Sequence, residues 1–380
     1  QNTANCYVIS APGYYSIPLV YGNAIKNGVT NASAYKSSAP VTNVTFGSPA
    51  TTRDVILHTL VDHDGSPISD PWIEKTNGNA NNGINGAQVV WADGANLVTL
   101  PSAPIYRDAS GNAFVKFEVT KANLKSGNAV IAVKKGNTIL WSWHLWFAPK
   151  NALTKIPVTN KQGKVFNFTE ETLGWKPTAW KGTSYSAPRT VKIRVEQAIG
   201  NGGNKQEAVV TITQNDGVEK NEGSANMYQW GRKDPYWPGM NLTSSDRVYD
   251  GGITLAQSVQ EPMKMGNRRA FYSALGTGPD GHEKWGSTWD WNNDPARECT
   301  YLNLWDANAT GYMDHNTSTF VKTIYDPSPA GFHIPRAADF SKLTEGRRRA
   351  ALRMGFINPE AGEHGNIPVY QGNLHGYYWT

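Results

Sequence analysis

The sequence is poor in cysteine and lacks several short motifs that mark common enzymes. Its two cysteines, Cys6 and Cys299, lie far apart among 380 residues and belong to no CxxC pair or Cys/His cluster, so nothing predicts a structural zinc site. One long-range disulfide between them stays open at this point. The GxSxG, HExxH and P-loop motifs are also absent. We therefore expect a protein that is not an enzyme and has no catalytic residues.

Long apolar runs and dense charge are lacking too. No segment approaches the about 18 consecutive apolar residues of a membrane span, so we expect no transmembrane segment. The net charge of +5 is thinly spread, and the densest basic run, GRRRAALR at residues 346–353, has the size of a solvated helix face. We expect no nucleic-acid partner. The first residues show no leader, yet 14 Trp and 17 Tyr beside two Cys favour an exported bacterial protein whose leader is absent from this sequence.

The residues that are abundant favour β-structure. Gly, Pro, Asn, Thr and Ser separate short runs rich in Val, Ile, Tyr and Trp, a pattern typical of short strands joined by turns. Several such strands at this spacing predict an immunoglobulin-like β-sandwich over residues 1–150. The strand candidates are CYVIS, YYSIPLV, DVILHTLV, AQVVWA, FVKFEVT, NAVIAV and NTILWSWHLWF.

The last of these runs, residues 137–147, holds three tryptophans and a histidine. It follows NAVIAV as the second strand of a hairpin, with the turn at residues 134–137. Alternation places Trp141 and Trp143 on one face, and two interpretations compete: burial in the core or a sugar-stacking platform. We favour the core. His144 and Trp146, on the other face, are expected to be more open, with a His144 ring nitrogen bonded to a backbone carbonyl.

The rest of the chain divides into two parts. Residues 151–222 repeat the strand pattern and predict a β-rich segment that packs with the next domain; alternation sets Val191, Ile193 and Val195 on one face of a strand, opposite Lys192, Arg194 and Glu196. Residues 223–380 are rich in Trp, Gly, Asn and Asp and predict a loop-rich α+β domain. One helix is expected near residues 336–356, split at Gly346.

Five stretches carry a family resemblance together: TANCYVISAPGYYSIPLVYGNAIKNG, GNAVIAVKKGNTILWSWHLWF, YQWGRKDP, KTIYDPSPAGFHIPRAADF and the closing HGYYWT. In this order they resemble the Bacteroidetes surface proteins that carry a Fibrobacter succinogenes major paralogous domain, often described as fimbrillin-like. Two departures stand out. The family has DPCP where this chain has Asp326-Pro327-Ser328-Pro329, and it continues past the YYW segment with further strands.

The resemblance implies a C-type-lectin-like or related fold for residues 223–380. It also implies a location at the cell surface, outer membrane or fimbrium, and binding or assembly in place of catalysis. Within YQWGRKDP we expect Arg232 to pair with Asp234 and Trp230 to lie in the core, and the resemblance implies a framework role for this segment.

Two acidic stretches are candidates for metal binding. VDHDGS brings Asp62, His63 and Asp64 together, but Asp-Gly favours turns, and we favour an Asx turn over a metal site. STWDWNNDPAREC is the sharper candidate, because four oxygen-bearing side chains within five residues suit calcium; the alternative is an Asn-rich loop pinned by core tryptophans. The proposed calcium ligands are Asp290, Asn292, Asn293 and Asp294.

Flat aromatic rings beside amides and carboxylates are what sugar-binding sites use, and loops often carry such sites. The glycan-binding candidates are Tyr236, Trp237, Trp285, Trp289, Trp291 and Trp305. The favoured hypothesis is a cell-surface adhesin or pilus-tip-like subunit that binds a glycan or a surface protein and contacts pilin subunits. The alternative is a glycan-binding lipoprotein beside an outer-membrane transporter. A glycosidase would need a carboxylate pair, for which only Asp290 and Asp294 qualify.

Overall fold

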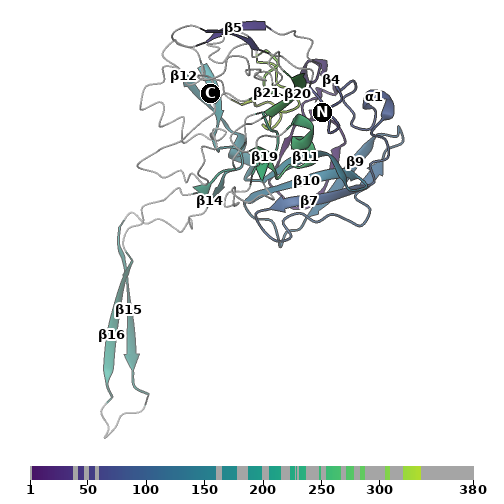
Figure 1. Ribbon diagram of the computed structural model, residues 1–380. Helices are drawn as coiled ribbons and strands as arrows, with labels where there is room; N and C mark the ends of the chain where they lie inside the picture. The colour runs from purple at the N-terminus through teal and green to yellow at the C-terminus, as the bar shows by residue number, and fades with distance from the viewer. Residues whose placement is uncertain are drawn as a thin grey trace.

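The computed structural model describes residues 2–36, 42–46, 51–55, 60–159, 165–177, 187–198, 205–214, 223–226, 228, 231–236, 248–249, 254–266, 271–277, 283–286, 304–308 and 320–334. Every structural statement below concerns these residues. They are mainly β, as the composition predicts, with several separate sheets and few helices (Figure 1).

Two sheets form the body. The larger has the order β1-β11-β10-β7, in which β1 runs parallel to β11 and the other pairs are antiparallel. The smaller is the antiparallel sheet β2-β9-β8. Their strands are β1 (Cys6–Ile9), β2 (Gly13–Pro18), β7 (Gly86–Ala92), β8 (Ile105–Arg107), β9 (Ala113–Val119), β10 (Gly127–Lys135) and β11 (Thr138–Phe147).

The remaining strands pair two by two, and the helices are short. The pairs are β3 (Ile25–Lys26) with β4 (Val29–Thr30), β5 (Thr42–Phe46) with β6 (Thr51–Val55), β12 (Lys155–Thr159) with β13 (Val165–Thr169), β14 (Lys176–Pro177) with β17 (Gly223–Ser224), β15 (Arg189–Glu196) with β16 (Glu207–Gln214), β18 (Val248–Tyr249) with β19 (Met265–Gly266), and β20 (Phe271–Thr277) with β21 (Glu283–Gly286). The helices are α1 (Thr76–Asn79), α2 (Leu255–Gln260), and the 3-10 turns Ala32–Ala34 and Lys150–Leu153.

The hairpin of β10 and β11 is confirmed. Lys135 pairs with Thr138, so Gly136 and Asn137 form a two-residue turn, and Gly136 has the positive φ of 60° that the first position of a type II′ turn requires. Trp141 and Trp143 are fully buried, which confirms the core interpretation of these two rings. The long hairpin therefore forms the centre of the larger sheet.

The expectation for the other face of β11 is wrong. His144 and Trp146 expose 0% and 1% of their surface. Described residues between 226 and 234 bond to Ser142 and His144 on this face, and the Trp175 carbonyl accepts from Trp146 Nε1. A strand covered on both faces carries no solvent-facing side. The sequence pattern alone does not reveal this second cover, since it comes from about 80 residues further along the chain.

Packing crosses the sequence boundaries that we predict at residues 150 and 222. One hydrophobic cluster runs from Cys6 to Ile334 and includes Trp141, Tyr228 and Trp305. Backbone contacts cross too: the Ile324 amide donates to the Ala34 carbonyl at 2.9 Å. Residues from the first and last predicted domains thus share one core.

Cys6 lies at one of these crossings. It is a free, buried thiol whose pKa is raised by desolvation, and an isolated β-bridge joins it to Pro329. Ser328, which stands where the resembling family has a cysteine, is therefore a close neighbour of Cys6. Cys299 lies outside the described residues.

Gly22 lies tightly against Asn5, whose side chain bonds to the residues around position 325. A Cβ on Gly22 would meet the Asn5 side chain at 2.1 Å, and Asn5 is held because its amide donates to the carbonyls of Ile324 and Asp326. We expect Gly22→Ala to lower the free energy of unfolding by about 3 kcal/mol in urea denaturation. Gly13→Ala is the matched control: its Cβ would sit 3.6 Å from the Tyr15 ring, an ordinary contact, and a loss above about 1 kcal/mol there would contradict this account.

Candidate functional site

A buried polar seam runs along the covered face of β11. We use this name for Ser142 and His144 of β11 with their partners from β10 and from residues 225–236. All of its members are buried. The seam residues are Asn128, Ser142, His144, Asn226, Tyr228, Lys233 and Asp234.

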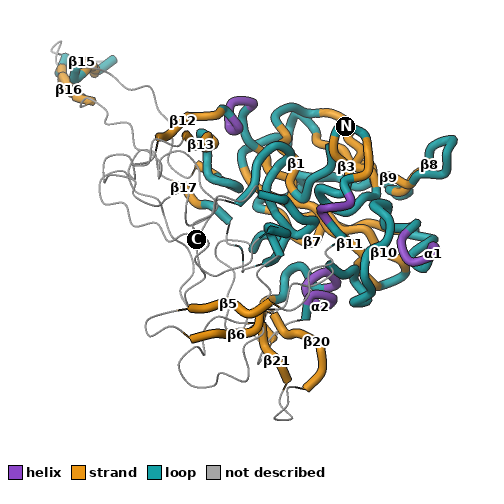
Figure 2. The backbone as a smooth tube through the Cα atoms, turned by 90° about the horizontal axis from the view of Figure 1, so that it is seen from above, coloured by secondary structure: helices purple, strands orange, loops and turns teal. Residues whose placement is uncertain are grey.

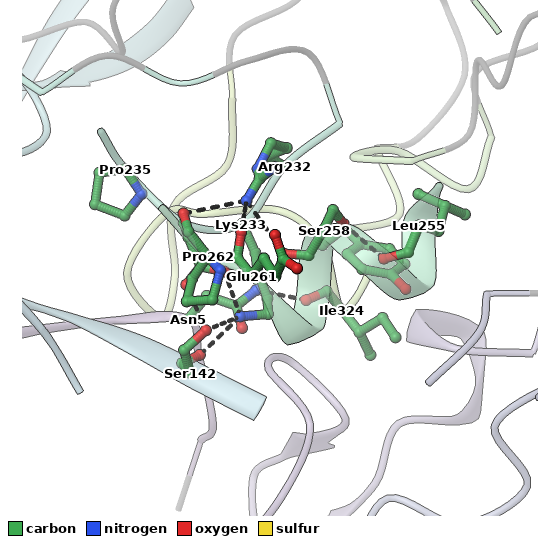
Figure 3. Close-up of polar contacts among 12 residues, drawn as sticks. Asn5, Ser142, Arg232, Lys233, Pro235, Leu255, Ser258, Glu261, Pro262 and Ile324 are labelled. Atoms are coloured by element: carbon green, nitrogen blue, oxygen red, sulfur yellow. Dashed lines mark hydrogen bonds and ion pairs between the residues drawn. The ribbon is translucent and has the colours of Figure 1, made fainter. Parts of the chain in front are cut away.

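At one end of the seam, Lys233 and Asp234 form an ion pair whose side chains are each 2% exposed. The Lys233 ammonium donates to Asp234 Oδ2 at 2.7 Å and to the Ser142 carbonyl at 3.0 Å, while the Ser142 hydroxyl donates to Asp234 Oδ1 at 2.7 Å. The ammonium also lies 4.4 Å from the ring centroid of Trp141. Figure 3 shows Lys233 directed at Ser142. Every polar atom of this pair thus has a partner inside the protein.

Burial sets the electrostatics of this pair. Desolvation lowers the pKa of Lys233 to about 8, against the opposing attraction of Asp234. A lysine with this pKa still carries its proton at neutral pH, so the pair is ionic there. The pair adds little net stability, because desolvating two charges offsets most of their attraction.

At the other end, His144 joins three elements. Asn128 donates from its amide to Asp93 Oδ2 at 3.0 Å and to the Gly174 carbonyl at 2.9 Å, which leaves its Oδ1 to accept from His144 Nε2 at 2.9 Å. His144 Nδ1 then accepts from the Tyr228 hydroxyl at 3.1 Å. The imidazole is therefore neutral, with its proton on Nε2, and its partners are side chains in place of the backbone carbonyl that we expect from the sequence.

Desolvation lowers the pKa of His144 to about 3. The seam therefore favours the neutral ring at pH values above about 3. A histidine of this kind does not exchange protons near pH 7, as a general acid or base must.

Arg232, next to the seam, corrects another expectation. It does not pair with Asp234; its guanidinium donates to the carbonyls of Ser258, Glu261, Pro262 and Lys264, where α2 ends (Figure 3). The negative end of the helix dipole favours a cation at this position. The guanidinium also lies 5.1 Å from the ring centroid of Tyr236. The segment GRKDP thus places two cations in the core: Arg232 bonds to carbonyls at the end of α2, and Lys233 bonds to Ser142 of β11.

The seam has reactive residue types but no route to a substrate. Ser142 beside Lys233 is a nucleophile–base combination, yet the hydroxyl of Ser142 is already shared between Lys233 and Asp234 and all three are buried. We assign the seam to the framework that joins residues 225–236 to the sheet.

The predicted glycan-binding residues fall into three groups. Tyr236 and Trp305 are buried, and each bonds to a backbone carbonyl, Tyr236 to Lys264 and Trp305 to Arg232. Burial leaves no ring face for a ligand, so both belong to the core. The backbone of Trp285 lies in β21, and nothing is described of its side chain. The others lie outside the described residues: Trp237, Trp289 and Trp291.

The proposed calcium ligands Asp290, Asn292, Asn293 and Asp294 also lie outside the described residues. Within the described part of the chain, no three His, Cys, Asp or Glu side chains come together as metal ligands. At VDHDGS the turn is confirmed: Asp62 Oδ1 accepts from the amides of Asp64 and Ser66, and Gly65 has a φ of 81°.

Among the residues that the structure describes, the largest group of exposed apolar side chains lies on a ribbon made of β15 and β16. Both views show it standing away from the body (Figures 1 and 2). Its register places Val191 opposite Ile212, Ile193 opposite Val210, and Val195 opposite Ala208, so these six side chains share one face. The five larger ones are 45% to 60% exposed. We call this the apolar face of the ribbon.

The opposite face of the ribbon is polar and internally paired. Arg194 forms ion pairs with Glu196 and Glu207, and Lys205 pairs with Glu196 at 3.1 Å. Alternation in the sequence predicts these two faces, but not that the apolar one is uncovered. Within the described part of the chain, no helix is long and apolar enough to span a membrane. Comparisons with family models, curated proteins and solved structures find no match for this chain.

Proposed function

We propose that this chain is a non-enzymatic cell-surface protein, an adhesin or pilus-tip-like subunit whose role is binding and assembly. The observation that supports this most is the apolar face of the ribbon. The family resemblance of the sequence adds the location, at the outer membrane or fimbrium, and a lectin-like C-terminal part that takes a glycan or surface protein. An immunoglobulin-like sandwich for residues 1–150 belongs to the same proposal.

A two-stranded ribbon is marginally stable at best in water, and it gains stability when its apolar face packs on another element. Here five large side chains of that face remain exposed, while the charges lie on the other side. An element with this division can pack its apolar face on a partner while its charged face stays in solvent. The ribbon is therefore the chain's docking element.

The size of the ribbon indicates how a partner binds. Strands of eight residues are about 26 Å long, and two of them span about 10 Å, which is a small footprint beside the about 800 Å² per partner of a standard interface. Among the described residues, neither β15 nor β16 has another pairing partner. A neighbouring subunit that adds a strand to an open edge would supply main-chain hydrogen bonds as well as apolar contact.

Two adjacent valines give a matched test of this proposal. Val210 lies on the apolar face and Val209 on the polar face opposite Arg194, and both are more than half exposed. In the source organism, we expect Val210→Asp to reduce cross-linking of the chain to its surface partner at least tenfold. Val209→Asp should leave it within about twofold of the wild type, because the new carboxylate would face the Arg194 cation across the two strands.

The identity of the cross-linked partner separates the two roles. A pilin supports the adhesin or pilus role, and an outer-membrane transporter would instead support a glycan-uptake lipoprotein. Two results would contradict the proposal altogether: equal loss in both valine variants, or resistance of the chain to protease added to intact cells.

A further inference from the structure

The outer face of the smaller sheet carries a second aromatic feature. Tyr106 of β8 pairs with Phe114 of β9, and their rings stack with centroids 5.1 Å apart and planes 15° apart. Trp72 meets Phe114 edge to face, with centroids 5.9 Å apart and planes at 74°. We call these three residues the aromatic strip. Val115, next to Phe114, is fully buried, so alternation turns Phe114 and its cross-strand partner Tyr106 away from the core, while Trp72 is half-buried and packs against the core.

Polar side chains surround the strip and are held in place. The Lys75 ammonium lies 5.2 Å from the ring centroid of Trp72 and donates to Asn112 Oδ1 at 2.7 Å. Asn112 in turn donates from its amide to Asp108 Oδ2 at 3.0 Å, and this bond contributes most to the lowered pKa of Asp108. The rim therefore offers an ammonium, an amide and a carboxylate that stays ionised near neutral pH.

Protein docking does not suit this surface. Tyr106 is 37% exposed and its two neighbours are half-buried, so the open aromatic area lies well below the about 800 Å² per partner of a standard interface. A protein surface would also have to desolvate the charged rim. A small ligand with its own hydroxyls can instead exchange hydrogen bonds with that rim while it covers the rings.

We propose that the aromatic strip binds a carbohydrate. A pyranose ring has one face of C–H groups, which packs on a flat aromatic ring, and an equator of hydroxyls, which can bond to Lys75, Asn112 and Asp108. Tyr106 is the stacking ring, since it is the most exposed of the three, and Phe114 supports it from behind. This site goes beyond the proposed function, which depends on the ribbon and not on the smaller sheet.

The test uses the full chain and four trisaccharides: cellotriose, mannotriose, xylotriose and chitotriose. We expect isothermal titration calorimetry to detect binding of at least one of them. Tyr106→Ala should raise its Kd at least tenfold, and Tyr106→Phe, which keeps the ring, should raise it less than threefold. Lys75→Met should weaken binding severalfold without removing a ring.

Tyr14→Ala is the matched control, because Tyr14 is on the same sheet, is 86% exposed, and pairs with Glu118 four residues from Phe114. It should leave the Kd unchanged, and all variants should keep the wild-type melting temperature within about 2 °C. Binding of none of the four sugars overturns the proposal. So does an equal loss in the Tyr14 and Tyr106 variants, or a Tyr106-dependent dimer in sedimentation without sugar binding. Loss of ribbon docking with this binding intact would refute only the proposed function.

Discussion

Replacing Asp234 with alanine is expected to lower the free energy of unfolding by about 3–5 kcal/mol at pH 7. The substitution leaves the Lys233 ammonium buried with the Ser142 oxygens and the Trp141 ring but without its carboxylate. The Ser142 hydroxyl loses its acceptor at the same time. Urea denaturation at pH 7 measures the loss directly.

A double variant and a pH series identify the cause. Lys233→Met combined with Asp234→Ala removes the buried charge and should recover more than half of the loss. The folded-state pKa of Lys233, about 8, lies below its ordinary value of 10.5, so the Lys233 contribution to stability rises between about pH 8 and pH 10.5. Cys6 and the buried tyrosines have raised pKa values and act in the opposite direction, so the Lys233 contribution is read from the difference between wild type and variants. For Asp234→Ala the Lys233 contribution should begin to rise at a lower pH, and should rise further in total, than in the wild type, because loss of the carboxylate lowers the folded-state pKa of Lys233 further. A double variant as unstable as the single one would show that packing, and not charge, causes the loss.

Acid is expected to destabilise the wild-type protein through His144. Its pKa is about 6.5 when the chain is unfolded and about 3 when it is folded, so below pH 6.5 the unfolded state binds a proton that the folded state excludes. The stabilisation is fully present above pH 6.5 and is lost as the pH falls toward 3. At about 1.4 kcal/mol per pKa unit, the stability lost through His144 reaches about 3 kcal/mol at pH 4 and about 4 kcal/mol at pH 3, where the folded-state ring is half protonated.

His144→Gln isolates this contribution. A glutamine amide can donate to Asn128 Oδ1 but does not take up a proton, so the stability of the variant should decline less steeply between pH 6.5 and pH 4. Buried carboxylates titrate in both proteins and cancel in the difference. Chemical denaturation at half-unit pH steps gives the two curves. Parallel curves would show that His144 is protonated in the folded state at low pH.

The sequence predicts local features of this fold well. Alternation and the Gly136-Asn137 turn are properties of neighbouring residues, and they identify the β10–β11 hairpin and its buried Trp141. The Asx turn at Asp62 is local in the same way. A single run of residues contains the pattern that determines each of them.

What the sequence does not predict depends on residues that meet only in the fold. His144 looks like a polar residue that faces solvent, but Tyr228 and Asn128 satisfy it from two other segments. Arg232 and Asp234 stand two apart in the chain, yet the end of α2 and Lys233 offer each a closer partner. Sequence alternation predicts the apolar face of the ribbon. That this face remains exposed depends on tertiary packing, which the alternation does not show. The aromatic strip brings Trp72 together with residues of two strands, so no single run of the sequence contains a motif that predicts it.

The placement of β1 governs the order in which this chain can fold. Cys6 pairs with His144 and also bridges Pro329, so the first strand meets partners that the ribosome makes much later. Pairing across such long sequence separations slows folding, because loop closure precedes any gain from contact. A nascent chain that ends near residue 150 contains every strand of the larger sheet. It lacks Tyr228 and Asp234, which contact the second face of β11. We therefore expect the core to become complete only after the residues near position 330 have been synthesised.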